Sequence, residues 1–285
     1  MSMSRIAVNT ASLVMVWGLA VGAGGSTSDG QTVAKQAAGP VGKDGAPTVV
    51  IPAGEFLMGS NDGAGNERPE HKVWLDAYAI DQYEVTIALY AKFLQDAKHD
   101  APMTWDDEAV TTAGNRPAVG LTWPDAAAYC AWAGKRLPTE AEWEKAARGT
   151  DGRRFPWGEM QPFVDIANYN RGNWVSDAIT LVPVTSGVEG MSIRHGLKEG
   201  GKSPFGLFHM AGNAAEWVAD WYERDYYQKS PAKNPKGPEG GDKRVIRGGS
   251  WADVPAGLRV TARVSAEPDF QDRTIGVRCA MGLSK

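Results

Sequence analysis

The chain has 285 residues, a formal net charge of −4 and 42% hydrophobic residues, enough apolar material for the core of one large domain or two small ones. That apolar fraction excludes a mainly disordered chain, and the mildly acidic balance argues against a nucleic-acid-binding protein. With only two cysteines, Cys130 and Cys279, and four histidines, an all-cysteine zinc site is excluded. Beyond the N-terminus, no apolar run is long enough to span a membrane.

The first 23 residues are typical of a signal peptide. Arg5 precedes a mostly apolar stretch at 6–20, and the small residues at 21–25 offer a cleavage site after Ala23. A retained anchor helix and a core helix are the alternatives, but polar residues interrupt the apolar stretch and glycines follow it directly. We therefore expect a periplasmic or secreted protein with no stable membrane span after signal cleavage.

Residues 24–47 are rich in Gly, Ser, Ala and Lys and contain no aromatic residue, so we expect a flexible leader there and a single domain over 48–285. Apolar or alternating runs predict strands; helical periodicity predicts the first helix, and capping boxes that begin at Thr122 and Thr139 predict the next two. The expected strands cover 49–51, 56–58, 72–80, 244–247, 258–264 and 276–280, and the expected helices cover 84–97, 122–133 and 139–148. From 149 to 243 the chain is mostly coil, whose backbone needs bound ions, a disulfide or buried Trp side chains for order.

Several distinctive motifs follow one another along the chain. They are IPAGEFLMGS at 51–60, ERPEH at 67–71, DQYEVT at 81–86, AYCAWAGKRLPTEAEWE at 128–144, FPWG at 155–158, GNAAEW at 212–217, RGGSW at 247–251 and GVRC at 276–279. Together they closely resemble the formylglycine-generating enzyme (sulfatase-modifying factor) family over about residues 49–281, and within it the periplasmic pyoverdine-maturation type.

The resemblance implies a fold that composition alone does not give. It is a coil-rich single α+β domain of C-type-lectin-like topology, stabilised by structural calcium. The resemblance also implies a disulfide between Cys130 and Cys279, for which two separate buried thiols are the alternative.

The metal chemistry of the active family members is missing from this sequence. Formylglycine-generating enzymes bind Cu(I) through two thiolates downstream of the Gly-Gly-Ser motif, where soft ligands suit that ion. The corresponding residues 250–263 contain no cysteine, so we expect no copper and no copper-dependent cysteine oxidation. The related sulfoxide synthases use clustered histidines for iron, whereas His71, His99, His195 and His209 stand singly here.

Two calcium sites are implied by the resemblance. The first comprises Asn168, Tyr169, Asp177 and Ile179, with side-chain oxygens from the Asn and Asp and backbone carbonyls from the others. The alternative is a solvated Asx turn. The second, doubtful site comprises Gly212, Ala214 and Glu216, because His209 stands where the family usually carries Asn or Asp, and imidazole is a poor calcium ligand. The alternative is that Glu216 does not bind calcium and instead caps a nearby backbone segment or pairs with a nearby residue.

The family's active site lies on and beside the Gly-Gly-Ser loop, so the resemblance places a cleft there. The candidate catalytic residues are Glu267, Asp253, Arg263 and Ser250, and the candidate substrate-binding residues are Trp251 and Arg259. Arg259 and Arg263, four apart on an expected strand, would share a face and could hold an anionic ligand, while Glu267 or Asp253 could act as a base. The alternative is a structural salt-bridge network.

One substitution in the motifs bears directly on this cleft. Where the family often has Trp, this chain has Ala215, which should widen the pocket or alter its floor.

Two functions fit these features almost equally. The first is an exported oxidative maturation enzyme, of the pyoverdine-maturation type, that binds a small molecule or peptide in the cleft. The second is a non-catalytic accessory factor for a client protein, in the assembly of an extracytoplasmic redox protein. Classical sulfatase activation fits less well because the thiols are absent.

Overall fold

The computed structural model describes residues 37–106, 113–163, 165–170, 181–186 and 201–283, all of which belong to one compact unit spanning 35–285. The predicted signal peptide at 1–23 lies outside the described residues. Among the described residues, no helix is long and apolar enough to cross a membrane.

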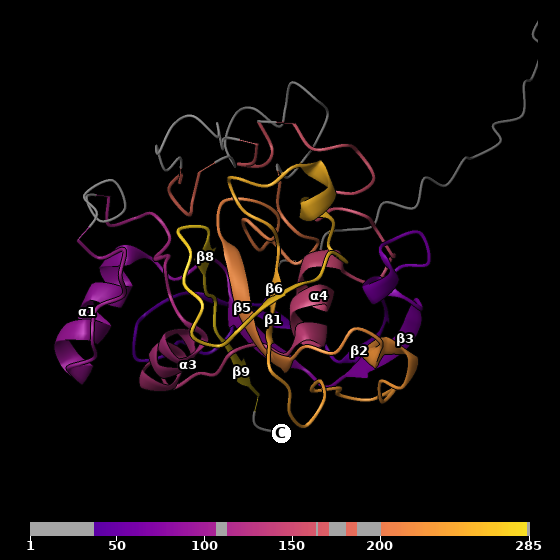
Figure 1. The fold of residues 1–285 in the computed structure, drawn as a ribbon, viewed down its shortest axis with the longest axis horizontal. Helices are drawn as coiled ribbons and strands as arrows, with labels where there is room; N and C mark the ends of the chain where they lie inside the picture. Colours follow the sequence, from indigo (N-terminus) through magenta and orange to yellow (C-terminus); the bar gives the residue numbers. More distant parts are fainter. Residues whose placement is uncertain (1–36, 107–112, 164, 171–180, 187–200, 284–285) are drawn as a thin grey trace, which may run out of the picture. The chain divides into compact units, whose positions relative to one another are not determined.

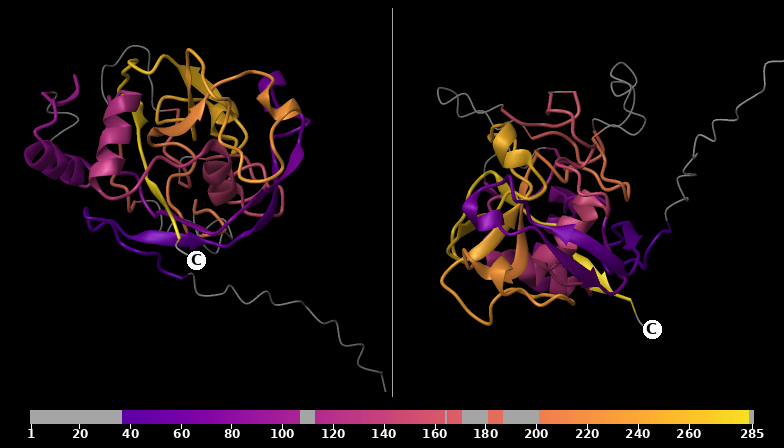
Figure 2. Two further views of the ribbon diagram at one scale, coloured as in Figure 1. Left: turned by 90° about the horizontal axis from the view of Figure 1, so that it is seen from below. Right: turned by 90° about the vertical axis from the view of Figure 1, so that its right-hand side faces the viewer.

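In the described part of the chain the strands form three sheets (Figure 1). The first, in the order β1 (Thr48–Ile51), β4 (Tyr78–Asp81), β9 (Ala280–Gly282), is antiparallel and brings the last strand beside the early ones (Figure 2). The second is the antiparallel pair β2 (Gly54–Met58) and β3 (His71–Leu75). The third runs β7 (Val264–Ala266), β6 (Arg244–Arg247), β5 (Ala215–Trp221), β8 (Ile275–Gly276), with β5 and β8 parallel.

The α-helices of the described segments lie on either side of β5 and β6 in Figure 1: α1 (Ile87–Ala97) and α3 (Trp123–Trp132) on one side, α4 (Glu140–Arg148) on the other. Each begins after a Thr cap, because the Thr hydroxyl accepts a hydrogen bond from an otherwise unpaired N–H of the first turn. The caps of α3 and α4 were predicted, whereas α1 was expected to begin at Glu84 and begins after Thr86. In α3 and α4 an acidic residue completes a capping box. Short 3-10 helices cover η1 (Gly65–Glu67), η3 (Tyr226–Gln228) and η4 (Pro255–Leu258).

The sequence motifs contribute large side chains to the hydrophobic core. Trp143 of α4 and Trp217 of β5 are fully buried. Cys130 of α3 and Cys279, between β8 and β9, form a disulfide with an S–S distance of 2.02 Å, which confirms the pairing implied by the resemblance. Because 149 residues separate the two cysteines in sequence, this bond links the middle of the chain to its end.

The described end of the predicted leader, residues 37–47, forms ordered contacts with the domain, and residues 24–36 lie outside the described residues. Within 37–47, the Gly39 N–H donates to the Thr48 carbonyl at 2.9 Å, and the Lys43 N–H donates to Ala133 at 2.9 Å. The buried Asp44 carboxylate accepts from the Lys135 ammonium at 2.9 Å. The composition of this segment, rich in Gly and Ala, does not reveal that it contacts residues such as Ala133 and Lys135.

Three predicted strands were wrong in extent, and one strand was missed. The run 72–80 divides into β3 and β4, which belong to different sheets, and 276–280 divides into β8 and β9. Residues 258–263 are not a strand, because their carbonyls at Val260 and Thr261 accept hydrogen bonds from the Arg247 guanidinium instead of from a neighbouring strand. Strand β5 was missed because it is buried on both faces and shows no alternation.

Candidate active site

A cavity of about 440 Å³ lies at the end of the four-stranded sheet, where β5 begins and β6 ends. Its walls come from β5 to β8 and from the loops that follow β6 and β7. The lining residues are Ala215, Ile246, Gly248, Gly249, Asp253, Gly257, Ala262, Val264, Ser265, Ala266, Glu267, Phe270, Asp272, Thr274 and Ile275. We call this cavity the cleft; it lies where the resemblance placed one, and the small Ala215 side chain forms part of its wall.

A larger cavity of about 640 Å³ lies toward the other end of β5, where Ala219, Trp123 and Tyr78 line it. None of the candidate catalytic or substrate-binding residues lines it. Size alone therefore does not identify the site, and the cleft is the better candidate because two of those residues meet there.

Two glycines shape the loop beside the cleft. Gly248 and Gly249 have φ values of 93° and 65°, in the region that favours glycine. A Cβ on Gly249 would lie 2.8 Å from the Gly257 carbonyl oxygen, so the loop can approach η4 only without a side chain there. The close approach positions the Ser250 backbone N–H and hydroxyl to donate to Asp253 Oδ2, at 2.8 and 2.6 Å.

Ser250 and Asp253 therefore have different roles. Ser250 is buried, with 1% exposure, and its hydroxyl is committed to Asp253, so it supports the loop and does not line the cleft. Asp253 is half-buried and lines the cleft. Its Oδ2 accepts both Ser250 bonds, whereas Oδ1 has no hydrogen-bond donor among the described residues. That oxygen can accept a proton or a hydrogen bond from a ligand.

Glu267 lies on the exposed side of the cleft. Its carboxylate is 3.4 Å from the Lys243 ammonium. A hydrogen bond from its own backbone N–H, followed by the interaction with Lys243, lowers the pKa of Glu267. It therefore carries a negative charge at neutral pH.

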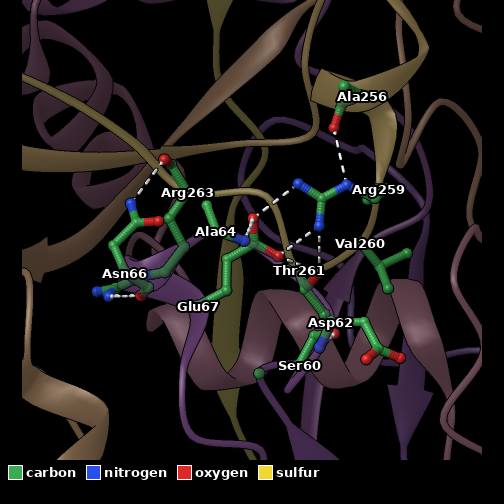
Figure 3. A network of polar contacts seen from close by, with 12 residues as sticks. Ser60, Asp62, Ala64, Asn66, Glu67, Ala256, Arg259, Val260, Thr261 and Arg263 are labelled. Carbon is green, nitrogen blue, oxygen red and sulfur yellow. Dashed lines mark hydrogen bonds and ion pairs between the residues drawn. The ribbon is translucent and has the colours of Figure 1, made fainter.

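Arg259 does not line the cleft, and its guanidinium points toward Glu67 (Figure 3). Its guanidinium binds Glu67 through both terminal nitrogens, at 2.5 and 2.7 Å, and the Thr261 hydroxyl donates to the same carboxylate at 2.6 Å. Burial raises the pKa of Glu67, but hydrogen bonds from Arg259 and Thr261 outweigh it, so the net shift is downward. This bidentate pair ties η1 to the segment that follows η4.

Arg263 is also committed to a carboxylate. Its Nε and Nη2 donate to Glu140 of α4 at 2.7 and 2.9 Å, and both side chains are buried. Arg247 contacts the same carboxylate at 3.2 Å. The expected anion-binding pair is therefore wrong: Arg259 and Arg263 do not lie on one strand, and each balances an internal acid, as the salt-bridge alternative predicted.

Trp251, expected to contact substrate, lies in the core. It is 8% exposed and packs in a cluster with Ile87, Val119 and Leu181. Its indole N–H donates to the Arg273 carbonyl at 3.4 Å. The side chain does not line the cleft.

Sequence reasoning missed Phe270 and Asp272, which also line the cleft. Asp272 Oδ1 accepts from the Thr274 N–H at 2.9 Å and from its hydroxyl. The loop EPDFQD at 267–272 carries a visible signal, since it places three acidic residues around a Phe directly after β7.

The first implied calcium site lies partly outside the described residues, which exclude Asp177 and Ile179. Asn168 is buried, and its amide donates to Asn213 Oδ1 at 3.0 Å. The Tyr169 hydroxyl donates to the Pro162 carbonyl. A buried amide and an irregular backbone are compatible with a hard cation, so this site stays a prediction.

The second calcium set does not fit the ion. Both oxygens of Glu216 accept from Arg278, with Nε–Oε2 and Nη2–Oε1 distances of 2.7 Å, and the Trp143 indole N–H donates to Oε2 at 2.7 Å. Burial and the nearby Arg278 lower the pKa of His209 to about 4, which leaves a neutral imidazole. In the described ranges no group of three or more His, Cys, Asp or Glu side chains could hold a metal ion.

Glu84 lies beside this set and was not singled out from the sequence. Its Oε1 accepts from the Ala214 N–H at 3.0 Å, and its Oε2 accepts from the Asn213 amide at 2.9 Å. Burial, with a further contribution from the Glu216 charge, raises the pKa of Glu84 to about 8. A protonated carboxyl in this position avoids a second negative charge beside Glu216.

Comparison with known proteins gives a consistent result. Residues 34–283 match the family described as "Sulfatase-modifying factor enzyme 1-like domain". The "Formylglycine-generating enzyme" of Streptomyces coelicolor is 34% identical over 284 residues, which covers 81% of this chain and 88% of that protein. The "Serine/threonine-protein kinase pkn1" of Chlamydia caviae is 34% identical over 254 residues, but the match covers 82% of this chain and only 38% of that longer protein.

Among solved structures, PvdO from Pseudomonas aeruginosa is similar over nearly its whole length. The TM-score is 0.68 at 27% sequence identity, and the match covers 87% of this chain and 98% of that chain. The fold around the cleft is thus shared with a protein of similar extent.

Proposed function

This chain belongs to the sulfatase-modifying factor family, and we propose that it is an exported oxidative maturation enzyme that acts on a small molecule or peptide without a thiol-copper site. Its mixed helix and sheet architecture is the coil-rich α+β fold of C-type-lectin-like topology that the resemblance predicted. Similarity to PvdO supports an activity of the pyoverdine-maturation type.

The observation that carries the proposal is the cleft beside the Gly-Gly-Ser loop. Ala215 leaves room in its wall, and the cleft brings together Asp253, which has an available Oδ1, and the ionised Glu267. Both cysteines of the chain are in the disulfide, so no thiolate is left to bind copper there. The donor set in the cleft is oxygen-based and suits proton transfer rather than soft-metal binding.

In the proposed reaction the substrate loses two electrons and two protons, and dioxygen takes them up as hydrogen peroxide. Asp253 accepts one proton through Oδ1, while Glu267 stabilises positive charge on the substrate at the entrance. Export through the signal peptide at 1–23 and calcium binding at the first site, which includes Asn168, are further parts of the proposal.

The test uses protein that begins at Gly24, with the reduced dihydro form of a pyoverdine chromophore as the probe. Chromophore fluorescence should appear together with oxygen uptake, and Asp253→Asn should reduce the rate at least tenfold. Glu55→Gln is the matched control, because Glu55 is an exposed carboxylate paired with Lys72 and does not line the cleft. Oxidation of a cysteine-containing sulfatase peptide with added copper would contradict the proposal.

The accessory-factor alternative keeps one supporting observation. Of the three charged residues expected to converge, Arg263 is committed to Glu140 and only Asp253 and Glu267 reach the cleft. If the protein binds ligands in the cleft but turns over no dihydro chromophore and takes up no oxygen, the accessory role is the better description.

A further inference from the structure

The surroundings of the cleft are acidic, whereas Arg259 and Arg263 suggested a basic site when the sequence was considered alone. Three carboxylates line it, those of the half-buried Asp253 and Asp272 and of the exposed Glu267, and the exposed Asp269 lines an adjoining hollow. Lys243 contacts one of them and Arg273 lies next to Asp272 in sequence, which still leaves the surroundings net negative.

The cleft also has an apolar rim. A second hollow of about 470 Å³ adjoins it, since Glu267 and Phe270 line both. Among the described residues, three exposed large apolar side chains line these two hollows. They are Val264 (58% exposed), Phe270 (44%) and Met103 (72%).

Such exposure is costly unless a partner covers it, and three of the seven exposed large apolar side chains in the described part of the chain lie at this one place. Val264 and Phe270 stand on the walls of a cavity whose other nonpolar lining residues are Ala, Gly and Ile. The combination of an apolar wall with a few placed charges is typical of a small-ligand site and not of a solvated loop.

We infer that the cleft binds ligands in which an ammonium or guanidinium group stands beside an apolar or aromatic body. This inference deepens the proposed function and rests on it for the identity of the site. The body packs against Phe270 and Val264, and the cation lies among Asp253, Glu267 and Asp272. Anionic ligands are disfavoured, because Arg259 and Arg263 are paired with internal acids and cannot turn toward them without leaving those acids buried and unpaired.

The test is calorimetric titration of the purified protein with three probes of the same shape: phenethylamine, phenethyl alcohol and 3-phenylpropanoate. We expect phenethylamine to bind at least tenfold more tightly than the alcohol, the carboxylate to bind least, and the preference to shrink at high salt. Equal binding of the three, tighter binding of the carboxylate, or no binding of the amine would overturn the inference.

Exposed residues provide variants that do not threaten folding. The double variant Glu267→Gln/Asp269→Asn should weaken amine binding about tenfold, at about threefold for each charge. Glu55→Gln should not change amine binding, because Glu55 does not line the cleft. It is a matched control for Glu267, since both carboxylates are exposed and paired with a Lys. Phe270→Ala should weaken both amine and alcohol, whereas Trp74→Ala, at the same 44% exposure on β3, should weaken neither.

Two further probes identify the source of the cation. A capped Phe-Lys dipeptide that binds more tightly than phenethylamine would point to a peptide substrate, and the reverse order to a small amine. Amine binding without oxidation of the dihydro chromophore would remove the proposed enzyme activity and leave this inference standing. Oxidation without any amine preference would do the opposite.

Discussion

The Cys130–Cys279 disulfide should contribute a large share of the stability of this coil-rich domain. Its sulfurs join α3 to the segment before β9, across 149 residues of sequence, and both residues are fully buried. In the chain-entropy model a closed loop of that length is worth about 5 kcal/mol, and measured values for native disulfides are more often about 2–4 kcal/mol. We expect the variant Cys130→Ala/Cys279→Ala to lose about 3 kcal/mol of unfolding free energy.

That loss is large enough to measure by thermal denaturation. For a domain of this size, about 1 kcal/mol corresponds to about 2–4 °C in the midpoint, so the double variant should melt about 6–12 °C lower than the wild type. Circular dichroism and calorimetry on the protein starting at Gly24 would both report it. Adding a strong reductant to the wild type should produce a similar drop.

The double variant is also the control for the reductant, because it has no disulfide to reduce. Its midpoint should not respond to reductant. If the variant melted at the same temperature as the wild type without reductant, the reasoning would be refuted, since the unfolded chain would then gain no freedom from loss of the bond. A reductant effect of equal size in wild type and variant would refute it as well, because the effect would not come from this bond.

Three further outcomes follow from the same structure. Burial, opposed by the Lys135 charge, raises the pKa of Asp81 to about 6 from 3.8; the folded state therefore binds this proton more tightly, and its contribution to stability is lost as the pH rises through about 6. Between about pH 5 and about pH 7.5, the unfolding free energy of the wild type should fall by about 1 kcal/mol more than that of Asp81→Asn. Parallel pH profiles of the two unfolding free energies would exclude Asp81 as the cause. Arg263→Met should cost about 3 kcal/mol in chemical denaturation because Glu140 stays buried, and a wild-type midpoint would show that the pair is not structural. Chelation by EGTA should lower the melting midpoint of wild type but not that of Asn168→Ala, and a wild-type midpoint indifferent to EGTA would remove calcium from the proposal.

Local signals in the sequence predicted the local structure well. The Thr caps of α3 and α4 depend on a hydroxyl and an N–H three residues away, and both helices begin where those residues indicated. The first helix, α1, was expected from Glu84 and begins at Ile87, after a Thr86 cap that helical periodicity alone does not indicate. The Cys130–Cys279 pairing, carried by the family motifs, is confirmed as well. Strand β5 was beyond such rules, because burial on both faces removes the alternation that identifies a strand.

The candidate site was predicted less completely, because long-range partners decide what each charged residue does. Arg259 meets an acid 192 residues away, and Arg263 meets one 123 residues away. Neither distance leaves a trace in the spacing of the arginines themselves. Asp253, in contrast, is held by Ser250 three residues earlier, and it lines the cleft where the motif placed it.

Solvation explains why the arginines and the carboxylates separate in this way. A guanidinium that enters a core is costly unless an acid neutralises it, so Arg263 is stable in the interior only together with Glu140. Carboxylates on exposed loops keep their hydration and need no partner, so Glu267 and Asp269 can stay beside a cavity without a structural role. The charges that remain available to a ligand are then the acidic ones. The arginines near the Gly-Gly-Ser loop, Arg259 and Arg263, instead stabilise the structure around the cleft.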